Sequence, residues 1–143
     1  MPQDCPITVC GRAELASTMA AFDATHLLLV IDPDEDENAA VRLADGRPTY
    51  IMPIWDDLVS ADDPDVPTRE DLSALIAWAD ALPSNARILI SCPLGLSRSP
   101  AVAYGLLRRH RTATEARDAV AAIRPQASPS PAITALWERF YKS

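Results

Sequence analysis

The sequence lacks the features of a membrane protein, of a disulfide-rich secreted protein and of a general nucleic-acid binder. No apolar run approaches the roughly 20 residues that span a bilayer, and the first residues lack the basic and apolar segments of a secretory signal. Three cysteines are too few and too irregular for a disulfide framework. The net charge of −7 argues against a broad basic surface for nucleic acid. We therefore expect a soluble cytoplasmic protein with neither nucleic acid nor membrane as a partner.

The composition is that of an ordinary globular protein. Hydrophobic residues make up 48% of the 143 residues and charged residues 23%, which is enough apolar material for one core. The length is close to the commonest domain size, and no internal repeat or low-complexity tract divides the chain. We expect residues 1–143 to form one domain.

Short apolar strands alternate with amphipathic helices along the chain. Residues 26–31 are a continuous apolar run, the pattern of a strand that is covered on both faces. Residues 55–67 carry five aspartates and two prolines without helical periodicity, so they predict a long loop. The alternation predicts an α/β fold with a mainly parallel central sheet, in which the last three helices cover one or both faces. Strands are expected at residues 6–9, 26–31, 49–54 and 87–91, and helices at 12–22, 69–82, 101–107, after Thr112 and after Pro131.

One segment, residues 88–100, combines groups that suit a phosphate ligand. A buried strand leads into Cys92, and a short loop that contains Gly95 then leads to Arg98, Ser99 and the start of a helix. A loop at a helix N-terminus directs backbone N–H groups and the helix dipole at one point. Gly95 permits backbone angles closed to other residues, and the fork of Arg98 can hold two phosphate oxygens. The same field favours a Cys92 thiolate that faces the phosphorus. The expected phosphate-binding residues are Pro93, Leu94, Gly95, Leu96, Ser97 and Arg98.

This pattern, C-x5-R in the fuller form C-x2-G-x2-R-S, resembles the signature loop of the cysteine-based protein tyrosine phosphatases. The chain looks like a compact, dual-specificity-like member of that superfamily. The resemblance implies a phosphatase-like α/β fold and hydrolysis of a phosphomonoester, carried by a protein or a small molecule, through a cysteinyl-phosphate. Cys92 would be the nucleophile, Arg98 would stabilise the phosphoryl oxygens, and Ser99 would assist departure of the thiolate. No cofactor and no metal are implied.

The same resemblance implies a general acid on a loop some thirty residues before the cysteine. Trp55-Asp56-Asp57 lies there, and Asp57 matches the third position of the family's Trp-Pro-Asp triplet. Asp57 is therefore the expected acid and Asp56 the alternative. Asp62 and Asp63 are more distant candidates.

Two residues depart from the family pattern. Ser91 stands where the family usually has histidine, and Pro93, which has no N–H, follows the nucleophile directly. Both departures leave open a weak or inactive phosphate-binding module. Another thiol enzyme, a sulfurtransferase or an arsenate reductase, is a third reading, and a reductase would need Cys5 or Cys10 near Cys92. The loop carries no lysine, which favours a simple monophosphate ester over a phosphoinositide.

Overall fold

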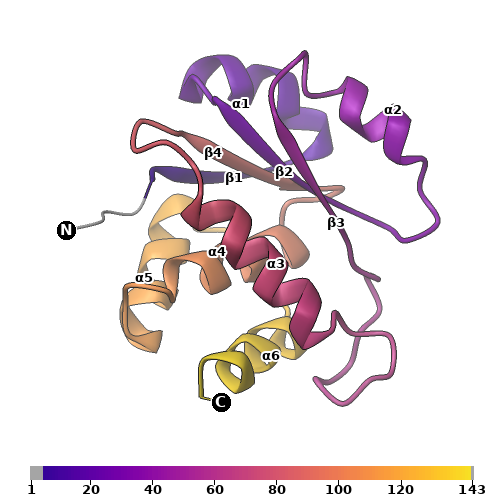
Figure 1. The fold of residues 1–143 in the computed structure, drawn as a ribbon, viewed down its shortest axis with the longest axis vertical. Helices are drawn as coiled ribbons and strands as arrows, with labels where there is room; N and C mark the ends of the chain where they lie inside the picture. Colours follow the sequence, from indigo (N-terminus) through magenta and orange to yellow (C-terminus); the bar gives the residue numbers. More distant parts are fainter. Residues whose placement is uncertain (1–4, 143) are drawn as a thin grey trace.

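Four short apolar segments form the central sheet of the computed structural model, which describes residues 5–142 (Figure 1). They are β1 (Ile7–Gly11), β2 (His26–Ile31), β3 (Thr49–Pro53) and β4 (Ile88–Cys92). Within the described residues the strand order is β1-β4-β2-β3, and every pairing is parallel. The predicted α/β fold with a parallel sheet is confirmed.

The strand register brings distant parts of the chain to one edge of the sheet. Gly11 at the end of β1 lies opposite Cys92 at the end of β4, while Ile31 at the end of β2 lies opposite Pro53. All four strands therefore end at the same edge. In parallel sheets covered by helices, ligands bind beyond this carboxyl edge.

Helices cover both faces of the sheet (Figure 1). Helices α1 and α2 lie on one face, and α3 to α6 lie on the other. The three C-terminal helices thus share a single face, one of the two arrangements that the sequence allowed. The helices are a 3-10 turn (Arg12–Glu14), α1 (Leu15–Phe22), α2 (Glu37–Arg42), α3 (Arg69–Asp80), α4 (Arg98–Leu107), α5 (Ala113–Ile123) and α6 (Pro131–Lys142).

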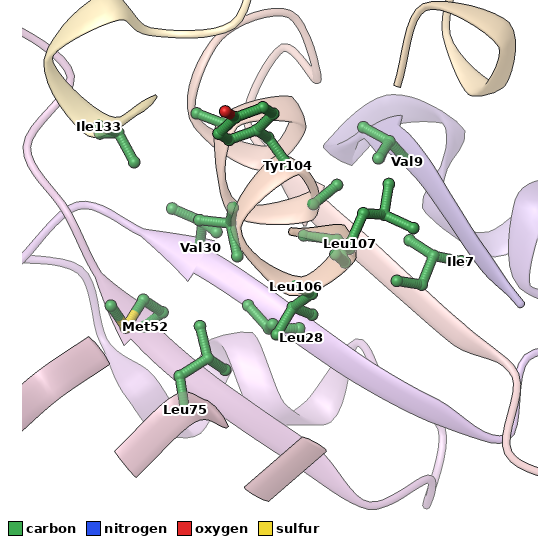
Figure 2. Close-up of a cluster of buried hydrophobic side chains, with 14 of the residues drawn as sticks. Ile7, Val9, Leu28, Val30, Met52, Leu75, Tyr104, Leu106, Leu107 and Ile133 are labelled. Atoms are coloured by element: carbon green, nitrogen blue, oxygen red, sulfur yellow. The ribbon is translucent and has the colours of Figure 1, made fainter. Parts of the chain in front are cut away.

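A separate apolar core fills each face. Figure 2 shows the larger core, in which side chains of the sheet such as Val30 meet Leu75 of α3 and Leu106 of α4. Every residue of α4 is buried. Helix α6 packs closely on α4, because a Cβ at Gly105 would lie 1.9 Å from the indole ring of Trp137. Helix α4 is thus packed between the sheet and α6.

Most predicted elements are present, with one omission. No helix was expected between residues 31 and 49, where the structure has the short helix α2, which begins where the Asp36 side chain accepts a hydrogen bond from the Asn38 amide. Six residues are too few to show helical periodicity, so the pattern gave no sign of it. No helix among residues 5–142 is long and apolar enough to cross a membrane.

Candidate active site

Cys92 is the last residue of β4, and its sulfur faces the start of α4. The thiol is only 2% exposed. The Gly95 amide donates to Sγ at 3.2 Å and the Ser99 amide at 3.4 Å, while Ser99 Oγ lies 3.0 Å from the sulfur. Two backbone N–H groups are thus directed at the sulfur, which lies at the positive end of the α4 dipole.

The loop between β4 and α4, residues 93–97, depends on glycine at its centre. Gly95 has φ +70°, and a Cβ there would lie 2.4 Å from the Gly11 backbone nitrogen. Both the left-handed conformation and the close approach to β1 therefore require glycine. This conformation turns the Gly95 amide toward the sulfur.

All five carbonyl oxygens of this loop accept hydrogen bonds from outside it. Backbone amides hold three of them: Arg12 N donates to Pro93 O (3.0 Å), Ser128 N to Leu96 O (2.7 Å) and Ser130 N to Ser97 O (3.1 Å). The Arg124 side chain holds the other two, donating to Gly95 O at 2.9 Å and to Leu94 O at 3.4 Å. Because a trans peptide directs N–H and C=O in opposite directions, outward carbonyls leave the loop amides directed inward.

Arg98, the first residue of α4, is 5% exposed and has different partners on its two edges. Its Nη1 donates to Asp32 Oδ1 at 2.6 Å and to the Ile54 carbonyl at 2.8 Å. Its Nε lies 3.5 Å from Asp56 Oδ1. The Nη1 edge is thus fixed, and the Nε–Nη2 edge is the one that a phosphate can take as a fork.

A pocket of about 270 Å³ opens above the sulfur. It brings together Cys92 and Arg98 with Pro93, Leu94, Leu96 and Ser97 of the predicted loop, and Gly95 contributes its amide to the sulfur without lining the pocket. The full lining is Asp32, Asp56, Cys92, Pro93, Leu94, Leu96, Ser97 and Arg98.

The acidic candidates separate clearly in the structure. Asp56 lines the pocket, whereas Asp57 is exposed and lies outside its lining. Asp62 pairs with Arg139 at 2.9 Å, and Asp63 accepts a hydrogen bond from the Asp65 amide within its own loop. The structure therefore brings Asp56, the alternative from the sequence, into the pocket and leaves Asp57 outside its lining.

Asp32 belongs to the site although the sequence analysis did not single it out. It follows β2 directly, so it lies at the carboxyl edge of the sheet near Arg98. The placement that suggested an acid after β3 applies equally to the residue after β2. That signal was present in the sequence.

Neither of the other thiols can partner Cys92 in this fold. Cys10 belongs to the core on the α1 face, whereas Cys92 belongs to the core on the α4 face. Burial raises the pKa of the Cys10 thiol and keeps it protonated. The Cys5 thiol contacts the Pro83 carbonyl, before the start of β4. This placement leaves the reductase reading without a resolving cysteine.

Ser91 lies outside the lining of the pocket. It is fully buried, and its backbone pairs with Cys10 of β1. Among residues 5–142, no three histidine, cysteine or acidic side chains lie together as a metal site.

Comparison with known proteins gives matches in structure but not in sequence. No protein-family model and no curated protein sequence matches the chain. Human DUSP28 superposes with a TM-score of 0.72 at 20% identity, over 95% of this chain and 91% of that one. PTPMT1 gives a TM-score of 0.68 at 18% identity, over 96% and 90% of the two chains. Tk-PTP in its active form gives 0.66 at 20% identity, over 97% and 93%.

These three proteins are matched over nearly their whole length, and the C-x5-R loop of this chain lies at the carboxyl edge of its sheet, between β4 and α4. At such identities the likeness is one of fold. The chain has the fold of the cysteine-based protein tyrosine phosphatases, in the compact form of the dual-specificity phosphatases.

Proposed function

We propose that the protein is a phosphomonoester hydrolase, a protein tyrosine or dual-specificity phosphatase that acts through a cysteinyl-phosphate. One observation carries the proposal. The Cys92 sulfur, which receives two backbone N–H groups, and the buried guanidinium of Arg98 line the same pocket at the N-terminus of α4. This arrangement suits a bound phosphoryl group and a thiolate that attacks it.

In the first step the Cys92 thiolate attacks phosphorus while the bond to the ester oxygen breaks. The Nε–Nη2 edge of Arg98 and the inward loop amides stabilise the equatorial oxygens, as preorganised donors do for developing charge. Asp56 donates its proton to the leaving oxygen.

In the second step water attacks the cysteinyl-phosphate. Asp56, now a carboxylate, takes the proton of the water as the new P–O bond forms and the P–S bond breaks. The hydroxyl of Ser99, 3.0 Å from the sulfur, hydrogen-bonds to the departing thiolate. Inorganic phosphate leaves, and Cys92 and Asp56 return to their starting forms. Side chains and backbone amides supply every group, so we expect turnover to persist in EDTA.

The substrate we propose is a simple monophosphate ester, on a protein or a small molecule. A second structure of PTPMT1 holds the phosphoinositide PI(5)P. Here the loop side chains most exposed at the pocket are apolar, with Leu94 71% exposed and Leu96 37% exposed. A loop without lysine offers little attraction to a polyanionic headgroup.

We place this activity in the cytoplasm and assign residues 1–143 to one phosphatase domain. A nucleophilic thiol must stay reduced, and the reducing cytoplasm keeps thiols in that state. The cysteines of the described residues are all free thiols.

Release of phosphate from p-nitrophenyl phosphate tests the proposal. The parent should turn over, and Cys92→Ser should lose turnover while still binding inorganic phosphate, because the loop and Arg98 persist. Cys10→Ser is the matched control, since it changes a buried thiol on the other face of the sheet. A Cys92→Ser protein with activity within tenfold of the parent would remove Cys92 from the mechanism.

A second candidate is a phosphate-binding module that does not turn over. Pro93 contributes no N–H to the loop, and in the resting structure carboxylates already contact Arg98 on both edges. A parent that binds inorganic phosphate but releases none from the ester would favour this function.

A further inference from the structure

The buried polar residues of the fold gather around the β4–α4 loop. Among residues 5–142 the polar or charged side chains that are buried are Ser91, Arg98, Ser99, Arg124 and Ser130. Arg98 ends the C-x5-R motif, Ser91 and Ser99 flank it, and Arg124 and the Ser130 amide donate to loop carbonyls. Burying such groups is costly unless they are paired. Arg98 and Ser99 take part in the proposed reaction. Arg124 does not line the pocket. It is nevertheless buried, at 8% exposed, and each of its guanidinium nitrogens donates a hydrogen bond.

Arg124 connects the loop to the segment after β1. On one side, Nε donates to Gly95 O and Nη2 to Leu94 O, as described above. On the other side, Nη2 lies 2.9 Å from Glu14 Oε1 and Nη1 lies 3.2 Å from Glu14 Oε2. Glu14 in turn accepts a hydrogen bond from the Gly11 amide at 3.1 Å. The Arg124 guanidinium and this amide hold the pKa of Glu14 below its ordinary value, so the pair stays ionised.

These contacts hold the two peptide planes on either side of Gly95. Holding Leu94 O outward directs the Gly95 amide inward, where it donates to Cys92 Sγ at 3.2 Å. Holding Gly95 O outward directs the Leu96 amide away from Arg124 in the same way. Glycine rotates more freely than any other residue, so these planes need an external restraint. The other three loop carbonyls are held by backbone amides, and only these two depend on a side chain.

We infer that Arg124, held by Glu14, is a positioning residue that orients the Gly95 and Leu96 amides for the phosphoryl group. The effect of Arg124 on catalysis rests on the proposed function. The effect of Arg124 on the order of the two peptide planes does not rest on that function.

The test compares Arg124→Met with Arg108→Met. Arg108 also pairs with a glutamate, with its Nε 3.0 Å from Glu138, but it lies at the far end of α4. We expect Arg124→Met to lower kcat/KM for p-nitrophenyl phosphate about 100-fold, the size of loss found when one preorganised donor is removed. Arg108→Met should stay within about twofold, as for an independent site. Arg124→Lys, which can reach one carbonyl but not both, should recover part of the loss.

A second measurement needs no ligand or turnover. Hydrogen exchange of the Gly95 amide, followed by NMR, should be faster in Arg124→Met than in the parent and unchanged in Arg108→Met. If the parent neither binds phosphate nor hydrolyses the ester, only the proposed function is contradicted. The exchange rate of the Gly95 amide still tests the role of Arg124 in that case. Equal exchange at Gly95 in parent and Arg124→Met, or equal losses in both methionine variants, would overturn the inference.

Glu14→Gln covers the case in which Arg124→Met does not fold. The Glu14 side chain is 49% exposed, so its substitution perturbs little of the core. Weakening its hold on Arg124 should give a smaller change in the same direction, with faster Gly95 exchange and lower kcat/KM. No change in Gly95 exchange in a folded Glu14→Gln protein would contradict the inference.

Discussion

At the scale of single residues, Arg98 holds two carboxylates in different ways. Asp32 binds Nη1, while Asp56 lies beside Nε, on the edge that we propose for phosphate. The first contact therefore positions the guanidinium, and in the proposed complex the second gives way to the phosphoryl group. The two acidic residues should respond differently to substitution.

Asp32→Ala should weaken phosphate binding and lower kcat/KM. A hydrogen bond to a charged group contributes about 1.5–3 kcal/mol, which corresponds to a loss of roughly 10- to 150-fold. Asp32→Asn keeps an acceptor for Nη1 and should lose less. Inhibition of turnover by inorganic phosphate measures the affinity. A higher affinity in Asp32→Ala would mean that Asp32 competes with phosphate for Arg98 instead of positioning it.

Asp56→Asn should lower turnover of an ester with a poor leaving group by about 10²–10⁴-fold, the usual contribution of a general acid. The loss should shrink with p-nitrophenyl phosphate, whose leaving group needs little protonation. Asp57→Asn is the matched control, because the two aspartates are neighbours in one exposed turn. A larger loss for Asp57→Asn with the poor leaving group would restore the assignment that the sequence favours.

At the scale of elements, the packing of α4 against α6 fixes the helix that carries the site. The backbone of Gly105 lies against the Trp137 ring, and the Tyr141 hydroxyl donates to the Gly105 carbonyl at 2.6 Å. These contacts leave no room for a side chain at position 105.

Gly105→Ala should therefore destabilise the fold by about 1–3 kcal/mol, the range for overpacking a core. Helix propensity alone predicts the opposite sign, a gain of about 1 kcal/mol for alanine over glycine. The urea unfolding midpoint distinguishes the two. A Gly105→Ala protein as stable as the parent would show that α6 can shift away from α4 at little cost.

Elements with strong local signals were predictable from the sequence. The apolar run 26–31 is β2 with the same bounds, and the β4–α4 loop lies where C-x5-R and Gly95 indicate. Helix α2 was missed, because its start depends on one capping aspartate and its length shows no period. The position of Asp56 relative to Asp57 depends on how one turn directs two adjacent side chains, which no residue pattern encodes.

At the scale of the whole molecule, the site is assembled from segments far apart in the sequence. Asp32 reaches Arg98 across 66 positions, and Glu14 reaches Arg124 across 110. The motif contains only the central segment, so it predicts the nucleophile and the arginine but not what holds them. Those supports follow from the strand order, which brings the ends of β1 and β2 to either side of β4.

The central claim is that phosphate transfer passes through Cys92. Asp56→Asn lacks the base for the second step, so with p-nitrophenyl phosphate it should accumulate the intermediate. Rapid acid quench and peptide mass spectrometry of this variant should find a phosphoryl group on Cys92, and the Cys92→Ser/Asp56→Asn double variant should carry none. A phosphoryl group on another residue would contradict transfer through Cys92. The same holds if the parent turns over the ester while Asp56→Asn carries no phosphoryl group on Cys92.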